Sequence, residues 1–245
     1  MDSVKEEQLL RARIADLRAQ AERRGRPAFS DFLDLRGQKV AREAAGPDGV
    51  FFGGFPRAER VMLCISPFPV PEGSYPLRAV RVAAGGYREL SHRDYLGTLM
   101  SLGIKREKLG DILVDSAGAT LFVCAAVAPF VCENLSKVGG DGVRAELLPS
   151  LPEIDWTAQV EERCGVIASE RFDCAVSEFA GKARGKASEL IGRGLALLNA
   201  AEAEPSVRVA EGDVVSIRGV GKFRICDLAG RTKKGNVVIR YEKYF

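Results

Sequence analysis

The sequence predicts an α+β fold in three consecutive domains, at residues 1–70, 71–155 and 156–245. Two proline-containing stretches, residues 67–76 and 149–155, have the composition of linkers and place the two boundaries. Helical and strand-like segments follow one another in mixed order, which favours α+β over a regularly alternating α/β fold. The excess of positive charge lies in the third domain.

The 245 residues are 46% hydrophobic and 28% charged, which is ordinary for a soluble globular protein. No apolar run approaches the roughly twenty residues of a membrane-spanning helix, so we expect no contact with a membrane. The N-terminal segment is charged and therefore unlike a signal peptide. These features predict a cytoplasmic protein.

The six cysteines are scattered, form no Cys-x-x-Cys pair and accompany a single histidine, His92. A zinc site of ordinary spacing is therefore not expected, and no cofactor is predicted. Cys64 and Cys124 lie in apolar runs, which favours reduced thiols that pack as small hydrophobic side chains. The chain also lacks a phosphate loop, a dinucleotide fingerprint and a nucleophile elbow, so we do not expect an enzyme.

The first domain is predicted to contain two helices followed by two short strands. Apolar residues at helical spacing mark the first helix, residues 1–24: Leu10, Ile14, Leu17 and Ala21. Ser30 or Asp31 is predicted to cap a second helix that continues to about Ala45, with Phe32 on its inward face. Strands are expected at residues 50–52 and 60–66.

The second domain is predicted to follow the order strand, helix, strand, strand, helix, strand. The segments are residues 77–83, 91–102, 111–114, 119–124, 129–137 and 143–148, with Ser91 as the cap of the first helix. This βαββαβ order is the ferredoxin-like plan, which resembles that of the RNA-recognition motif (RRM). The strands that stack bases in an RRM carry one aromatic residue here, Phe122, so base stacking on this sheet is not expected.

Polar residues gather around the start of the first helix of this domain and the turn that follows it. His92 and Asp94 are two residues apart, so their side chains point about 200° apart on a helix and form no catalytic dyad. We expect RNA contacts instead, from His92, Arg93, Lys105 and Arg106. A solvated helix end is the open alternative.

The third domain begins with a strand-like segment at residues 160–168, and Arg171 then opens a segment of helical spacing. Gly192 and Gly194 end the helical pattern. Strands are expected at residues 195–198 and 214–218, with the segment 207–209 between them, and two more strands between residues 223 and 245. A basic turn with Lys233 and Lys234 joins the last two strands, and this turn either contacts phosphate or is solvated.

Charge is unevenly distributed along the chain. From Arg171 onward, 14 basic residues accompany 9 acidic ones, whereas the remainder has 22 basic and 24 acidic residues. A local excess of positive charge is typical of a phosphate-binding segment. The candidate contacts in this segment are Arg171, Lys182, Arg184, Lys186, Arg193, Lys233 and Lys234.

Several motifs of the third domain occur in a familiar order. Arg171-Phe172-Asp173 opens the first helix, and Ala183-Arg184-Gly185-Lys186-Ala187 opens the second. These are followed by Ile191, Gly194, Asn199, Pro205 and Gly212-Asp213. In these motifs the segment resembles the S4 RNA-binding domain. S4 domains usually have Asn-Gly where this chain has Asn199-Ala200, and because Asn-Gly accepts positive φ at both positions, we expect a longer or looser turn here.

Further motifs lie in the first two domains. They are Phe32-Leu33-Asp34, Gly53-Gly54-Phe55-Pro56, Ala58-Glu59-Arg60, Ser91-His92-Arg93-Asp94-Tyr95-Leu96-Gly97 and residues 102–112. Together with the S4-like segment, they make nearly the whole chain similar to the YlmH-type bacterial S4 proteins. The resemblance implies a non-enzymatic RNA-binding protein of ribosome-associated quality control. The implied partners are large-subunit rRNA, tRNA on subunits that still carry peptidyl-tRNA, and the factor that adds C-terminal alanine tails.

Two other functions stay open at this point. An RNA-modifying enzyme anchored by an S4 domain would need a catalytic aspartate in a large sheet domain, and residues 71–155 are few for such a domain. A cell-division interaction protein, for which RNA binding is incidental, would hold its partners at high salt. Phosphate contacts, in contrast, weaken steeply with salt.

Overall fold

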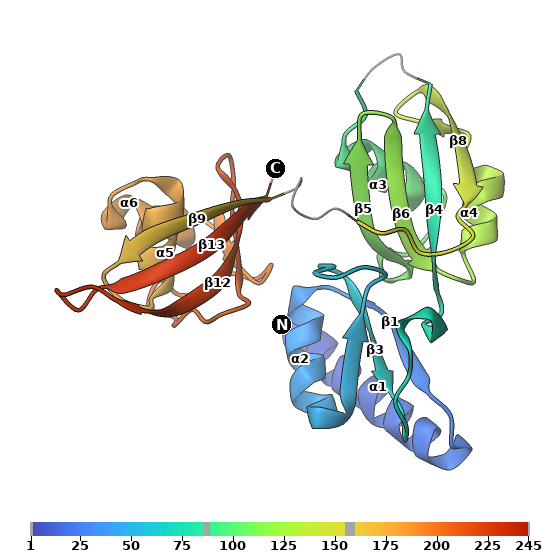
Figure 1. Cartoon of the computed structure of the whole chain (residues 1–245), viewed down its shortest axis with the longest axis horizontal. Coiled ribbons are helices and arrows are strands. Elements are labelled where there is room, and N and C mark those ends of the chain that lie inside the picture. The colour runs from blue at the N-terminus through green and yellow to red at the C-terminus, as the bar shows by residue number, and fades with distance from the viewer. Residues whose placement is uncertain (1, 86–88, 155–159, 245) are drawn as a thin grey trace. The chain divides into compact units, whose positions relative to one another are not determined.

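Figure 1 shows the computed structural model, which describes residues 2–85, 89–154 and 160–244. The chain divides into two compact units, Met1–Ile154 and Asp155–Phe245. The predicted domains 1–70 and 71–155 lie in unit 1, except for residue 155. The end of the predicted linker and the predicted start of the third domain lie at 155–159, outside the described residues.

The N-terminal part of unit 1 combines two helices with a three-stranded antiparallel sheet. Its elements are α1 (Asp2–Arg24), β1 (Ala28–Leu33), α2 (Leu35–Ala45), β2 (Gly49–Phe52) and β3 (Val61–Ile65), with the strand order β1-β3-β2. Ile14 and Ala21 of α1 are buried in one cluster with Ala41 and Leu63. The predicted first helix, its apolar face and the strands β2 and β3 are therefore confirmed.

The second helix begins later than predicted. Ser30 and Asp31 lie in β1, and the cap of α2 is Asp34, whose Oδ1 accepts the backbone N–H of Gly37 at 2.7 Å. Ser30 Oγ instead accepts the N–H of Leu63 on the neighbouring strand at 2.9 Å. The predicted cap was wrong because pairing with β3 fixes this segment as a strand, and such a long-range contact overrides local propensity.

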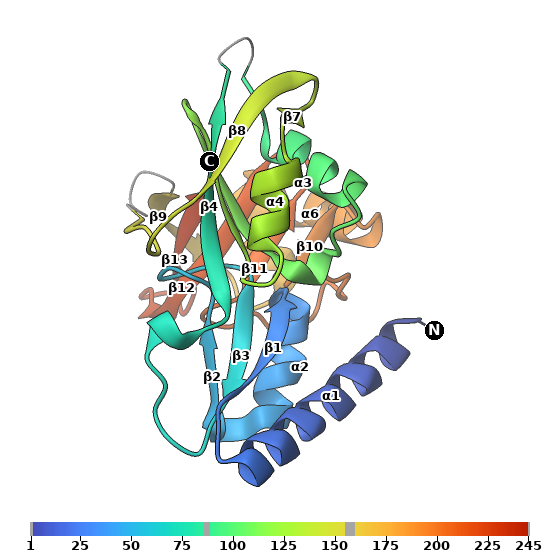
Figure 2. The same cartoon turned by 90° about the vertical axis from the view of Figure 1, so that its right-hand side faces the viewer.

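The middle part of unit 1 follows the predicted βαββαβ order, with one additional short strand. Its elements are β4 (Leu77–Ala84), α3 (His92–Ser101), β5 (Leu109–Asp115), β6 (Gly118–Cys124), α4 (Ala128–Asn134), β7 (Lys137–Val138) and β8 (Asp141–Leu147). The antiparallel strand order is β5-β6-β4-β8-β7, and α3 and α4 cover one face of the sheet (Figure 2). Tyr95, Leu99 and Val131 of these helices are fully buried against that face.

Ser91 caps α3 as predicted. Its backbone N–H donates to Asp94 Oδ2 at 2.9 Å, and its side chain accepts the N–H of Asp94, which completes a capping box. Short 3-10 helices at Gly46–Asp48, Glu72–Ser74 and Arg106–Lys108 complete the unit. Among the helices that the structure describes, none is long and apolar enough to cross a membrane.

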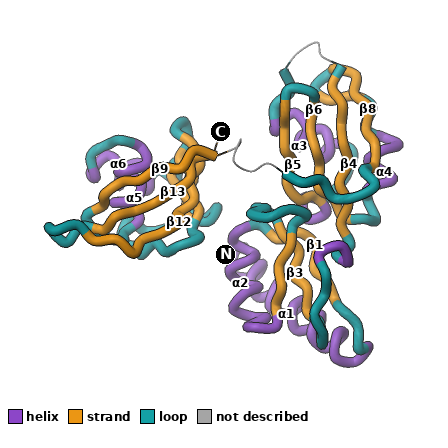
Figure 3. The backbone as a smooth tube through the Cα atoms, in the orientation of Figure 1, coloured by secondary structure: helices purple, strands orange, loops and turns teal. Residues whose placement is uncertain are grey.

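The described residues of unit 2 form a five-stranded antiparallel sheet and two helices. The elements are β9 (Val160–Ile167), α5 (Phe172–Ala180), α6 (Arg184–Gly192), β10 (Ala196–Leu198), β11 (Val214–Ile217), β12 (Gly221–Arg231) and β13 (Val237–Tyr244). Figure 3 traces α5 and α6 beside the strands β9, β12 and β13. The strand order is β10-β11-β12-β13-β9, so the first strand of the unit pairs with the last, from Val160 opposite Tyr244 to Ile167 opposite Val237. Phe179 of α5 stacks on Phe223 of β12, with ring centroids 4.8 Å apart.

The segment at residues 207–209 forms an isolated bridge, between Arg171 and Arg208. The turn after β10 differs from the prediction. Asn199 and Ala200 have φ angles of 51° and 62°, and Leu198 and Ala201 exchange backbone hydrogen bonds of 2.9 and 3.0 Å. This is a tight two-residue turn with positive φ at both positions. The expected longer or looser turn was therefore wrong.

The side chain of Asn199 explains how the turn stays tight without glycine. Its amide oxygen accepts the N–H of Val214 at 2.9 Å, and its amide nitrogen donates to Asp213 at 2.7 Å. Val214 begins β11, and Asp213 directly precedes it. These bonds hold the turn against the neighbouring strand and offset the unfavourable backbone conformation of Ala200.

Candidate RNA interface

On the face of the middle sheet opposite α3 and α4, the ring of Phe122 is covered by other side chains. This ring is 1% exposed and lies 4.9 Å from the ring of Phe55, centroid to centroid. Gly54 and Gly110 allow the approach, because a Cβ atom at Gly54 would come within 2.4 Å of the Phe122 ring and one at Gly110 within 2.7 Å of Phe32. The aromatic position at which an RRM stacks bases is therefore occupied by packing within unit 1, in agreement with the prediction that bases do not stack there.

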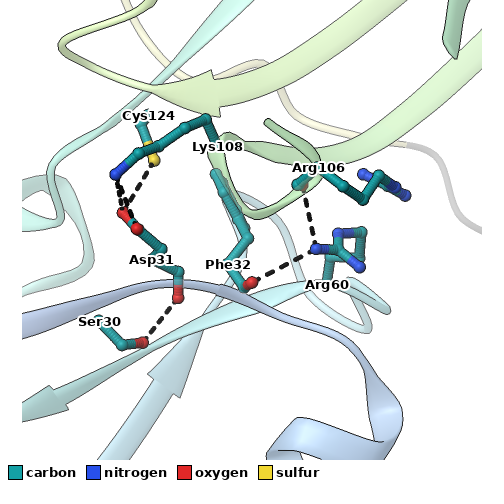
Figure 4. Close-up of polar contacts among 7 residues, drawn as sticks. All are labelled: Ser30, Asp31, Phe32, Arg60, Arg106, Lys108 and Cys124. Carbon is teal, nitrogen blue, oxygen red and sulfur yellow. Dashed lines mark hydrogen bonds and ion pairs between the residues drawn. The ribbon is translucent and has the colours of Figure 1, made fainter. Parts of the chain in front are cut away.

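Polar contacts fasten the same two parts of unit 1 together (Figure 4). Lys108 Nζ binds both oxygens of Asp31 at 2.6 and 2.7 Å. Arg60 donates to the carbonyl oxygens of Leu109 at 2.8 Å and Phe32 at 3.3 Å. Asp111 accepts the backbone N–H groups of residues 59 and 60. These contacts join the N-terminal sheet to the turn before β5.

Cys124 lies in this contact, 3.7 Å from Asp31 Oδ1. Burial, followed by the nearby charge of Asp31, raises the pKa of its thiol to about 12. A thiol that stays protonated at neutral pH is a poor nucleophile, so Cys124 has a structural role. Within the described part of the chain, no group of three or more His, Cys, Asp or Glu side chains is placed to hold a metal ion.

Three of the four predicted RNA contacts of the middle part are exposed. His92 and Arg93 form the first turn of α3, and Lys105 directly precedes the following 3-10 helix. Arg106 differs, because it donates to the carbonyl oxygens of Leu109 at 3.0 Å and Gly110 at 3.3 Å. Burial and the neighbouring Arg60 lower the pKa of Arg106 to about 10. The Arg106 side chain thus contributes to the fold at this turn.

In unit 2, Asp173 brings two of the predicted arginines together. Its carboxylate accepts hydrogen bonds from Arg171 Nε and Nη at 3.1 Å each and from Arg184 Nε at 3.0 Å. The Asp173 side chain is 4% exposed, whereas those of Arg171 and Arg184 are 39% and 52% exposed. Burial alone would raise the pKa of Asp173, but the two arginines outweigh it and lower the pKa. We call this arrangement the Asp173 clamp.

The connection between α5 and α6 places the lysines beside the clamp. Gly181 ends α5 in the left-handed conformation, with φ of 60°, and Ala183 is the cap of α6. Lys182, Lys186 and Arg193 line a shallow cavity of about 390 Å³ together with Ala183, Glu189 and Leu190. Lys186 also pairs with Glu189 at 2.8 Å. The two helices therefore present rigidly based cations on one surface, which suits phosphate binding.

Lys233 and Lys234 are exposed in the turn between β12 and β13. Backbone hydrogen bonds of 2.8 and 2.9 Å, from Thr232 to Asn236 and from Gly235 to Thr232, close this turn. Two further arginines that are not among the predicted contacts lie against Glu170: Arg208 and Arg231, which begins the basic turn. Glu170 directly precedes Arg171, so this second carboxylate could be noticed in the local sequence. Its partners lie far away in the chain and could not.

Residues 79–150 match the family model described as "Putative RNA-binding domain in YlmH". The chain is 34% identical over 229 residues to ribosome-associated protein quality control protein P2 of Bacillus subtilis, covering 89% of this chain and 88% of that protein. A solved structure, cell division protein ylmH from Streptococcus pneumoniae, matches with a TM-score of 0.52 and 19% identity. It covers 59% of this chain and 92% of that one, and the likeness shows a shared fold.

Proposed function

The chain belongs to the YlmH family, and from this premise we propose that it is a ribosome-associated RNA-binding protein of translational quality control. The observation that carries the proposal is the surface of α5 and α6, where Lys182 and Lys186 flank Arg184 of the Asp173 clamp in the chain. A buried carboxylate that fixes exposed guanidinium groups lowers the entropy lost when they bind a phosphate. We propose that this surface binds rRNA and tRNA on large subunits that carry peptidyl-tRNA, in the cytoplasm.

The proposed mechanism is positioning without bond chemistry. The thiol of Cys124 is held protonated and Phe122 is covered, so neither offers reactivity or a base-binding platform. His92, Arg93 and Lys105 add exposed contacts from unit 1. The proposed outcome is a tRNA held in place for the factor that adds alanine tails. If the pure protein altered nucleotides of large-subunit rRNA, detected by mass spectrometry, an RNA-modifying enzyme would be the better assignment.

The direct test replaces Lys182 and Lys186 by Gln and measures co-sedimentation with purified large ribosomal subunits. Both lysines are exposed and neither holds Asp173, so the fold should persist. We expect affinity to fall about tenfold, because each lost phosphate contact removes favourable counterion release.

The control for this test removes the same charge elsewhere in unit 2. Arg163 of β9 and Arg240 of β13 are exposed and paired with Glu161 and Asp227. The Arg163→Gln plus Arg240→Gln protein should sediment with subunits as the unmodified chain does. Normal sedimentation of the Lys182→Gln plus Lys186→Gln protein would show that the α5–α6 surface is not the RNA contact.

A further inference from the structure

A further arginine, Arg208, lies opposite Arg171 of the Asp173 clamp. Backbone hydrogen bonds of 2.8 and 2.9 Å flank Arg171 and Arg208, which face one another across an antiparallel bridge. Residues opposed in this way have neighbouring Cα atoms, and like charges in such positions repel each other. The fold nevertheless keeps two arginines here.

Glu170 binds Arg208 and Arg231 at the same time. Its Oε2 accepts from Arg208 Nε at 2.7 Å, and its Oε1 accepts from Arg231 Nη at 2.8 Å. The Glu170 side chain is 15% exposed, whereas those of Arg208 and Arg231 are 79% and 55% exposed. A largely buried carboxylate therefore orients two guanidinium groups that stay open to solvent. We call this arrangement the Glu170 clamp.

The two clamps connect the helices to the basic turn. Glu170 precedes Arg171 in the chain, and Arg231 ends β12 just before Lys233 and Lys234. Four arginines share the two carboxylates, which leaves an excess of two positive charges. Exposed ion pairs contribute little to stability, so stability alone is a weak reason for placing this much like charge together.

From this geometry we infer a second phosphate-binding site, formed by Arg208 and Arg231 and oriented by Glu170 as a positioning residue. The ligand is the phosphodiester backbone of RNA. The inference rests on the proposed function and extends its surface from α5 and α6 to the β12–β13 turn. Lys233 and Lys234 then lie at the outer end of one continuous cationic surface.

The test measures binding of the full-length chain to labelled large-subunit rRNA over a series of salt concentrations. We expect Arg208→Gln plus Arg231→Gln to lower the affinity about tenfold and to reduce the slope of log K against log salt by about 2. The Arg163→Gln plus Arg240→Gln protein, which loses the same charge, should change affinity less than about twofold. Equal weakening in the two proteins would mean that only the overall charge matters, and would overturn the site.

Glu170→Gln tests the positioning role through the sign of its effect. Removal of a negative charge strengthens RNA binding if charge alone governs it, whereas loss of orientation weakens binding, by about threefold. We expect weaker binding by a chain in which unit 2 is still folded; tighter binding would overturn the role of Glu170. Thermal unfolding of each variant checks that unit 2 is folded.

The outcomes separate this inference from the proposed function. A wild-type chain that does not bind rRNA contradicts the proposed function itself. A chain that binds, and that weakens at Lys182 and Lys186 but not at Arg208 and Arg231, contradicts only the second site.

Discussion

Single carboxylates determine where the exposed arginines of unit 2 lie. Asp173 is buried, yet its pKa is lowered, because the hydrogen bonds from Arg171 and Arg184 outweigh the cost of removing the carboxylate from water. Removing both charged donors would leave a buried carboxylate unpaired, which is energetically costly. Asp173 therefore contributes to folding as well as to the shape of the proposed RNA surface.

This lowered pKa predicts a specific pH dependence of stability. A carboxylate whose folded pKa lies below its unfolded value contributes stability above the unfolded value and loses it as pH falls through the folded pKa. Asp173→Asn should therefore reduce the free energy of unfolding at neutral pH by about 1–3 kcal/mol. The difference from wild type should shrink as pH falls below about 4. Urea unfolding across this range measures both proteins, and a pH-independent difference would contradict the role of the ion pairs.

The two clamps differ in how far the sequence could predict them. Asp173 and Arg184 are eleven residues apart and Arg171 lies two residues before Asp173, inside motifs at the start of two helices, so their common surface was predictable. The partners of Glu170 are 38 and 61 residues away. No local pattern connects them, because the contact exists only once the last strands have formed the sheet.

At the scale of elements, turns and caps show where local rules fail. The spacing of Ile14 and Ala21 predicted α1, and Ser91 predicted the start of α3, because each signal is contained in one helix and its cap. The cap of α2 and the turn at Asn199 depend on the neighbouring strands β3 and β11, which the local sequence does not contain.

The tight turn after β10 predicts a stabilising substitution. Ala200 has a φ of 62°, which costs a residue with a Cβ atom about 1 kcal/mol. Ala200→Gly removes this cost but adds freedom to the unfolded chain, so we expect a net gain of about 0.5 kcal/mol. Ala201→Gly is the matched control and should be destabilising, because Ala201 is not among the residues with positive φ. Chemical unfolding measures the free energy of unfolding of both variants. A loss of stability in Ala200→Gly would show that glycine loosens the turn.

At the scale of the whole molecule, unit 1 is held together across two sheets. The predicted boundary near residue 70 followed the prolines between β3 and β4, yet residues on both sides of it share the aromatic contact of Phe55 and Phe122 and the ion pair of Lys108 and Asp31. The composition identified the segment that connects the two sheets. It did not identify the contact between the sheets, since that contact depends on residues far apart in sequence.

Gly110 provides a test of this coupling. An added methyl group would come within 2.7 Å of the Phe32 ring and 3.1 Å of Phe122 Cβ, so Gly110→Ala should destabilise unit 1 by about 1–3 kcal/mol. Gly142→Ala, also in a strand of this unit, meets no atom within 4 Å and should be nearly neutral. We expect the Gly110→Ala loss in thermal unfolding of residues 1–154, as one transition. Equal melting of the two variants would mean that the sheets do not depend on this contact.

The pairing of β9 with β13 has a consequence for how unit 2 can be joined to other chains. Val160 and Tyr244 are direct partners, so β9 begins beside the point at which β13 ends. A fold whose ends meet can be inserted into a surface loop of a host protein, or circularly permuted, with little loop-closure cost. Unit 2 has the geometry of a transferable module, whose basic surface on α5 and α6 lies on elements other than the two strands that connect it.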